Sequence, residues 1–213
     1  MRVWDSELLA AKKPVEMVTD GLIMWIDGRD APSNYALHER VTNTNISPNS
    51  RTNYTTSQTS DGLFTKFATT GSAYAAYYFN GSAAKTVEFV VSPLTLYAYA
   101  VDAGNSELMY VSRNYSTAPF VRATYRVAGT GIYVYPDSFP QHYVIRPHSA
   151  MINGVKTEEQ GTITTAFAYA KRINSWSAHD EVIGAIRAYN RELTDDEILQ
   201  NLEYEKSIGR VVL

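Results

Sequence analysis

Short apolar and β-branched runs, each ending in turn residues, recur along most of this 213-residue chain. The first is "LIMWID" at residues 22–27, and the runs become dense after Asp61-Gly62, where two aromatic-rich runs flank Asn80-Gly81. The later runs are "LTLYAYAVDAGN", "ELMYVS", "FVRATYRVAG", "GIYVYPD", "QHYVIRP" and "SAMINGVKTEE". Strands repeated at this spacing predict an antiparallel sandwich or barrel rather than βαβ units.

Three segments differ from this pattern. Asn153-Gly154 between apolar neighbours predicts a tight turn. Residues 41–60 are almost all Thr, Asn and Ser, and we expect an extended surface excursion there rather than a strand. The run "SELLAAKK" predicts a short helix with Asp5 as its cap. We therefore divide the chain into an N-terminal arm, residues 1–20, and one large domain, residues 21–213.

The end of the chain combines a strand, a corner and a helix in few residues. "VIGAIRAYN" alternates as a last strand does, although both of its faces are mostly apolar. Thr194 and Glu197 have the spacing of a capping box, and Ile198, Leu199 and Leu202 form an apolar stripe. A single terminal helix on a β domain is expected to lie over an edge or an end of the sheets.

Composition excludes several partners. Nineteen basic and 22 acidic residues give a net charge of −3, and no basic run could neutralise a row of phosphates, so we expect no nucleic acid. No secretion signal is visible and no stretch approaches the roughly 18 apolar residues of a membrane helix, so we expect synthesis in a cytoplasm and no membrane contact. Cysteine is absent, which excludes disulfides and thiolate metal sites.

Three motifs carry a resemblance to a known family. "AIRAYNRELTDDEI" resembles the closing strand and helix of concanavalin A-like (laminin-G-like) jelly-roll domains. "YYFNGSAAKTVEFVVSP" and "AMINGVKT" resemble two earlier motifs of the family, in the same order, and the similarity spans about residues 21–206. The resemblance implies an all-β, antiparallel jelly-roll β-sandwich with short N- and C-terminal helices.

Chains with this ending are similar to bacteriophage structural or receptor-binding proteins. The resemblance implies a non-catalytic virion component, a capsid decoration or tail protein, whose first twenty residues dock on other virion subunits in a homo-oligomeric assembly. Two alternatives stay open: a carbohydrate-binding module of a cellular surface system, and a diverged glycoside hydrolase.

The residues themselves offer little for catalysis. Glycosidases on this fold carry a Glu-x-Asp-x-x-Glu spacing on one strand, which is missing here. Glu88 is alone on its strand, and we expect it to form a structural pair with Arg187. The four histidines lack metal spacing, so we expect no metal site and no cofactor. Calcium binding by loop oxygens is the one alternative, although turn and cap roles suit the candidate residues better: Asp27, Asp30, Asp102 and Asn105.

Sixteen tyrosines are the main compositional oddity. A ring with a hydroxyl suits sugars, whose axial hydrogens pack on the aromatic face. Tyr97 and Tyr99 share one face of a strand, as do Tyr133 and Tyr135, and Trp176 lies in a polar stretch. We expect glycan binding at these five residues. Tyrosine also favours strands and protein interfaces, which is the alternative interpretation.

Overall fold

The computed structural model of this protein describes residues 14–48, 50–92, 96–101, 121–124, 131–134, 141–146, 149–156, 167–175 and 180–212. The helix predicted for "SELLAAKK" lies outside these residues. Within the described part of the chain, no helix has the length and apolarity that crossing a membrane requires.

Eight strands form the first layer of the fold in the order β12-β11-β10-β6-β14-β1-β2-β3, and all neighbours are antiparallel. The central strands are β6 (Thr86–Ser92), β14 (Asp180–Tyr189) and β1 (Leu22–Asp27). The flanking strands are β10 (Gln141–Arg146), β11 (Ser149–Ile152), β12 (Val155–Lys156), β2 (Leu37–Glu39) and β3 (Thr44–Ile46). Asn153 and Gly154 join β11 to β12 with positive φ angles of 50° and 78°, so the predicted tight turn is confirmed.

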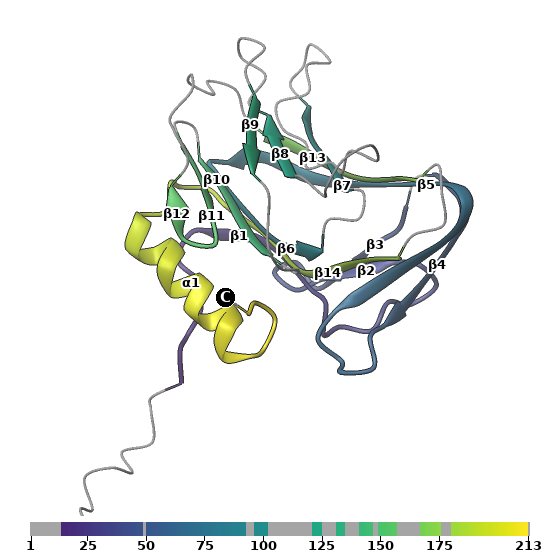
Figure 1. Ribbon diagram of the computed structural model, residues 1–213, viewed down its shortest axis with the longest axis horizontal. Coiled ribbons are helices and arrows are strands. Elements are labelled where there is room, and N and C mark those ends of the chain that lie inside the picture. Colours follow the sequence, from purple (N-terminus) through teal and green to yellow (C-terminus); the bar gives the residue numbers. More distant parts are fainter. Residues whose placement is uncertain are drawn as a thin grey trace, which may run out of the picture.

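The second layer consists of β4 (Ser50–Gln58), β5 (Thr65–Ala84), β7 (Leu96–Val101) and β13 (Phe167–Ser175). The start of β5 pairs with β14, while its later part pairs with β13, so β5 passes from the first layer to the second (Figure 1). A separate two-stranded sheet contains β8 (Val121–Thr124) and β9 (Gly131–Val134). The predicted fold class, an all-β antiparallel sandwich with a C-terminal helix, is confirmed.

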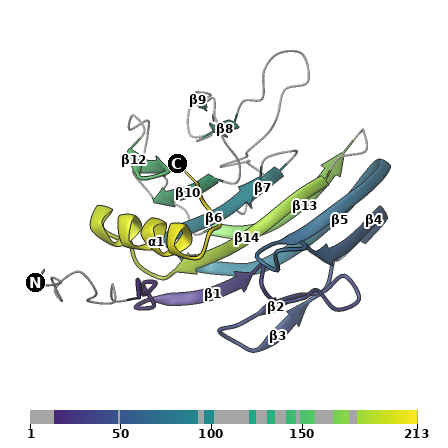
Figure 2. The ribbon, with the colours of Figure 1, turned by 60° about the horizontal axis from the view of Figure 1, so that its bottom comes forward.

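The helix α1 (Asp195–Ser207) begins at the predicted capping box. The Thr194 hydroxyl accepts a hydrogen bond from the Glu197 amide at 3.3 Å, and the Thr194 amide donates to the Glu197 carboxylate at 2.8 Å. The expectation that this helix covers an edge or end of the sheets is wrong. Its buried side chains contact β6 and β14 in the middle of the first layer, on the face turned away from the second layer (Figure 2).

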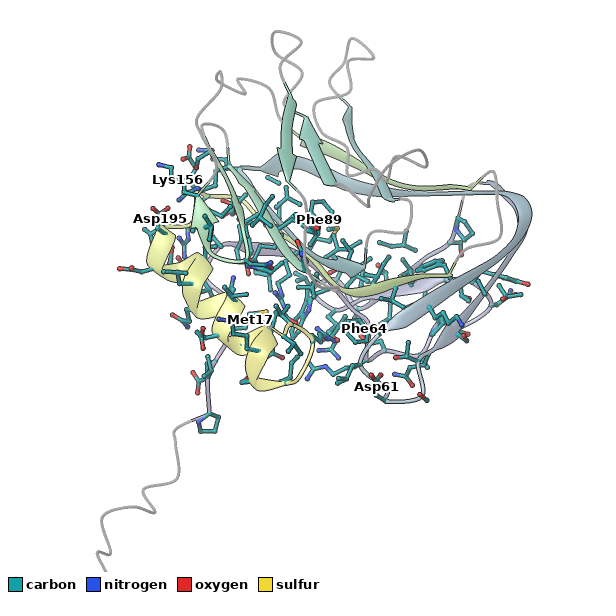
Figure 3. The ribbon with its side chains drawn as sticks, in the orientation of Figure 1. Met17, Asp61, Phe64, Phe89, Lys156 and Asp195 are labelled. Carbon is teal, nitrogen blue, oxygen red and sulfur yellow. The ribbon has the colours of Figure 1, made fainter. Side chains whose placement is uncertain are left out.

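Strands β6 and β14 are therefore buried on both faces. Val90 and Ala185 pack with Leu202 and Val211 on the helix side, whereas Phe89 lies on the side turned towards the second layer (Figure 3). Alternating side chains on one strand thus meet two different layers. This double burial explains why the last strand has apolar residues on both faces.

Two sequence predictions about the strands are wrong. Asn80-Gly81 does not separate two strand runs, because β5 continues to Ala84 and the chain turns at Lys85. Between the partner pairs Tyr169↔Phe79 and Phe167↔Ala84, β5 has more residues than β13, so Asn80-Gly81 lies in a bulge, where glycine is common.

The Thr/Asn-rich segment is also more ordered than predicted. It contains β3 and β4, and β4 pairs with β5 over most of its length. Threonine is β-branched and favours a pleated strand even where the segment as a whole is polar.

Candidate functional site

Charged side chains fill the space between α1 and the first layer (Figure 3). We name this set the buried charge network. Each member is almost completely buried, although all carry charged or polar groups, and together they are Asp27, Glu88, His142, Arg187, Tyr189, Asn201, Glu205 and Arg210. Such groups are stable inside a protein only when each is paired and hydrogen-bonded.

Glu88 lies at the centre of the network. Its Oε2 accepts hydrogen bonds from the Tyr189 hydroxyl at 3.1 Å and from Asn201 Nδ2 at 2.9 Å, and its Oε1 lies 3.0 Å from His142 Nε2. The structure places Arg187, the expected partner, directly opposite Glu88 on β14, with Nη1 3.4 Å from Oε2. Burial by itself raises the pKa of Glu88, but the hydrogen bond and charge of His142 and the charge of Arg187 outweigh it and lower that pKa.

Beyond Glu88, positive and negative side chains alternate. Arg187 also pairs with Glu205 of α1, and Glu205 Oε2 lies 3.2 Å from Nη1 of Arg210. Arg210 pairs in turn with Asp27 at the end of β1. The network therefore ties the helix and the segment after it to four strands of the first layer: β1, β6, β10 and β14.

Asp27 ends the network on the side nearest solvent. Its carboxylate accepts hydrogen bonds from Arg29 Nη2 at 2.6 Å and the Arg29 amide at 3.0 Å, and it lies 2.9 Å from Arg40 Nη1. Burial raises the pKa of Asp27, but the hydrogen bonds from Arg29 and the charges of Arg210 and Arg40 outweigh it and lower the pKa to about 2. Asp27 is thus held ionised by guanidinium groups.

These contacts also bear on calcium. Asp27 and Asp30 were candidate ligands, but the Asp30 carboxylate is bound by Arg40, with Nε at 2.7 Å and Nη2 at 2.8 Å. Arginines therefore occupy the oxygens that a cation would need. Asp102 and Asn105 lie outside the described residues. Among the residues that the structure describes, no three His, Asp or Glu side chains are grouped to hold a metal ion.

The tyrosine candidates fall into separate parts of the fold. In the second layer, Tyr97 is the partner of Arg172 on β13 and Tyr99 is the partner of Ala170, which is in turn the partner of Tyr78 on β5. Direct partners in antiparallel strands share a face, so the register brings Tyr78 to the face that carries Tyr97 and Tyr99. Tyr133 lies in the separate sheet, opposite Arg122. Tyr135 and Trp176 lie outside the described residues.

The sequence predicted the pairing of two members of the network, Glu88 and Arg187, but not the contacts of the others. A signal for two more existed on α1, where Ile198, Asn201, Leu202 and Glu205 follow the i, i+3, i+4, i+7 spacing of one buried stripe. Polar residues on such a stripe indicate buried partners. Nothing in the local sequence of His142 or Arg210 reveals that each lies beside a carboxylate far away along the chain.

No protein-family model matches this sequence, and no curated protein matches it either. Several solved structures share its fold. The chain is similar to Trypanosoma rangeli sialidase, with a TM-score of 0.63 and 15% identity over 91% of this chain and 34% of that one. It is also similar to the receptor-binding domain of botulinum neurotoxin type G, with a TM-score of 0.55 and 11% identity over 87% of this chain and 52% of that one.

A third similar structure is the binding domain of botulinum neurotoxin DC in complex with SialylT, with a TM-score of 0.51 and 10% identity over 88% of this chain and 52% of that one. The chain thus spans about a third to a half of the length of these proteins. At such identities the likeness shows the β-sandwich fold alone.

Proposed function

We propose that this chain is a non-catalytic glycan-binding sandwich. The observation that carries the proposal is the register of the second layer, which gathers Tyr78, Tyr97 and Tyr99 on one face across neighbouring strands. Several aromatic residues at sheet spacing form a platform on which a chain of sugar rings can stack, while the phenol hydroxyls hydrogen-bond to the sugar.

The chemistry of the network supports a binding role over a catalytic one. A glycosidase needs two carboxyl groups that reach the substrate. Glu88, Glu205 and Asp27 are buried between α1 and the first layer, and each is held in ion pairs by arginine. Carboxylates engaged in this way stabilise the fold and are not available for proton transfer to a sugar.

Proteins that share the fold give further support. T. rangeli sialidase is known in complex with sialic acid, and the botulinum neurotoxin DC binding domain in complex with SialylT. These ligands belong to those proteins. They support the proposal as ligands of proteins that share the fold, of whose length this chain spans about a third to a half.

The finer proposal is that several copies of the chain are displayed on a bacteriophage particle, as a capsid decoration or tail component. Its support is the resemblance of the closing motif to phage proteins. Residues 16–20 are held on the body of the domain: the Val18 amide donates to Asn201 Oδ1 at 2.8 Å, and Gln200 Nε2 donates to the Glu16 carbonyl at 2.8 Å. The preceding residues would then dock on another virion subunit.

A glycan array followed by calorimetry tests the binding role. We expect the double variant Tyr97→Ala, Tyr99→Ala to lose roughly tenfold or more in affinity for any glycan that binds, because both stacking surfaces are removed. The matched control is Tyr77→Ala with Tyr169→Ala, since these residues occupy the opposite face of the layer by register. Equal losses in both double variants, or no glycan bound, would contradict the proposal.

Mass spectrometry of purified phage particles tests the finer role. A cellular carbohydrate-binding module would be absent from particles, whereas a virion component would be recovered with them in constant proportion to the other subunits.

A further inference from the structure

The second layer has an unusual charge. Its strands β4, β5, β7 and β13 contain the cations Arg51, Lys66, Lys171 and Arg172 and no Asp or Glu. The chain as a whole has more acidic than basic residues, 22 against 19. Carboxylates are present in the first layer and α1, for example Glu88, Glu181 and Glu205. The charged residues on the described strands of the second layer are thus all cations, and the carboxylates nearest along the ladder are Asp180 and Glu181 of β14, the partners of Ala68 and Phe67 on β5.

By register, two of these cations are direct partners of tyrosines, one on each face of the layer. Arg172 and Lys171 are neighbours on β13, so they occupy opposite faces. Arg172 is the partner of Tyr97 on β7, and Lys171 is the partner of Tyr77 on β5. Each face thus combines a cation with an adjacent tyrosine and has no carboxylate among the described strands.

We propose that the second layer binds an anionic glycan, a polysaccharide whose sugars carry carboxylate or sulfate groups. This inference rests on the glycan-binding function proposed above and adds the charge of the ligand. Tyrosine supplies the stacking surface for a ring, and the adjacent guanidinium or ammonium group pairs with the acid on that ring. The described strands of this layer carry no carboxylate of their own that would repel an acidic ligand.

The pattern favours a sugar over a nucleic acid. Single-stranded nucleic acids are bound along a continuous positive groove that neutralises successive phosphates. Here the four cations are distributed over three strands and two faces, with only one adjacent pair. An acidic polysaccharide bound through its rings requires only isolated cations at sugar spacing.

The test uses the full chain and two matched pairs of polymers in calorimetry: polygalacturonate with its fully methyl-esterified form, and dextran sulfate with dextran. Each pair keeps its backbone and differs in charge. We expect at least one charged form to bind about tenfold or more tightly than its neutral partner, with an affinity that falls as salt increases.

Single-charge variants then locate the site. We expect Arg172→Gln, on the face of Tyr97 and Tyr99, to lose about tenfold in affinity for the charged polymer and little for the neutral one, whereas Lys171→Gln, on the opposite face, should bind nearly as the original protein does. Lys206→Gln is the control for net charge, because Lys206 lies on α1 in an exposed pair with Glu203. An equal loss in the Lys206→Gln variant would overturn the inference, since attraction would then be nonspecific.

The remaining outcomes separate this inference from the proposed function. If charged and neutral forms bind alike, and the Tyr97→Ala, Tyr99→Ala variant weakens both, the chain is a glycan binder and the charge inference is wrong. If no polysaccharide binds, both are wrong. Tighter binding of a single-stranded oligonucleotide than of any polysaccharide would also overturn the inference.

Discussion

At the scale of single residues, Glu88 shows what a buried charge requires. Four groups from two strands and a helix surround its carboxylate, and Arg187 is also bound by Glu205. Removing one member leaves the others buried without a full set of partners, which costs more than the pair itself contributes. The free energy of unfolding should therefore be far more sensitive to Glu88 than to an exposed glutamate.

We expect Glu88→Gln to lower the free energy of unfolding by about 3 kcal/mol, measured by urea denaturation at pH 7, because Arg187 and His142 lose a charged partner. The control is Glu203→Gln, which breaks the exposed pair with Lys206 and should change stability by about 0.5 kcal/mol or less. A similar loss in the two variants would mean that the network is energetically unimportant.

Asp27 predicts a dependence of stability on pH. Its pKa is about 2 in the folded protein and 3.8 when unperturbed, so the unfolded chain takes up the proton first as pH falls. Its contribution of about 2.5 kcal/mol is complete above about pH 5 and is lost progressively as pH falls through 3.8 and then through about 2. Urea denaturation between pH 2 and 7 should show this fall, and Asp27→Asn should be less stable at pH 7 with a shallower dependence below pH 4. An unchanged slope in the variant would assign the effect to other carboxyl groups, such as Glu197.

At the scale of elements, features set by neighbouring residues were predictable and those set by distant partners were not. The start of α1 follows from Thr194 and Glu197, three residues apart, and the β11–β12 turn follows from Asn153-Gly154. The bulge at Asn80-Gly81 depends on how β13 pairs with β5, and the position of α1 depends on a layer whose two faces both need cover. The same short motif can therefore be a turn or a bulge, because long-range pairing decides between them.

The cap of α1 gives a prediction at this scale. Thr194→Ala removes the hydroxyl that accepts from the Glu197 amide, and we expect the free energy of unfolding to fall by about 1 kcal/mol in urea denaturation. Thr194→Ser keeps the hydroxyl and should stay close to the original protein. If serine were as destabilising as alanine, the methyl group rather than the cap would be responsible.

At the scale of the whole molecule, the two ends of the described chain are fastened together. Val18 packs in a cluster with Tyr189 and Ile198, and its amide donates to Asn201, 183 positions along the chain. Asp20 adds an ion pair to Arg191 at 2.7 Å. Residues 16–20 thus help to hold α1 against the first layer, whereas residues 1–13 are proposed to dock on another virion subunit.

Two truncations separate these roles. Removing residues 1–13 should leave the free energy of unfolding within about 0.5 kcal/mol of the full chain, because the contacts of Val18 and Asp20 remain. Removing residues 1–20 should lower it by about 2 kcal/mol, from the burial of Val18 and its hydrogen bond to Asn201. The variant without residues 1–13 should also be missing from purified phage particles, although it is folded. Its full incorporation would show that assembly uses another surface, and equal stability of the two truncations would show that residues 14–20 do not hold the helix in place.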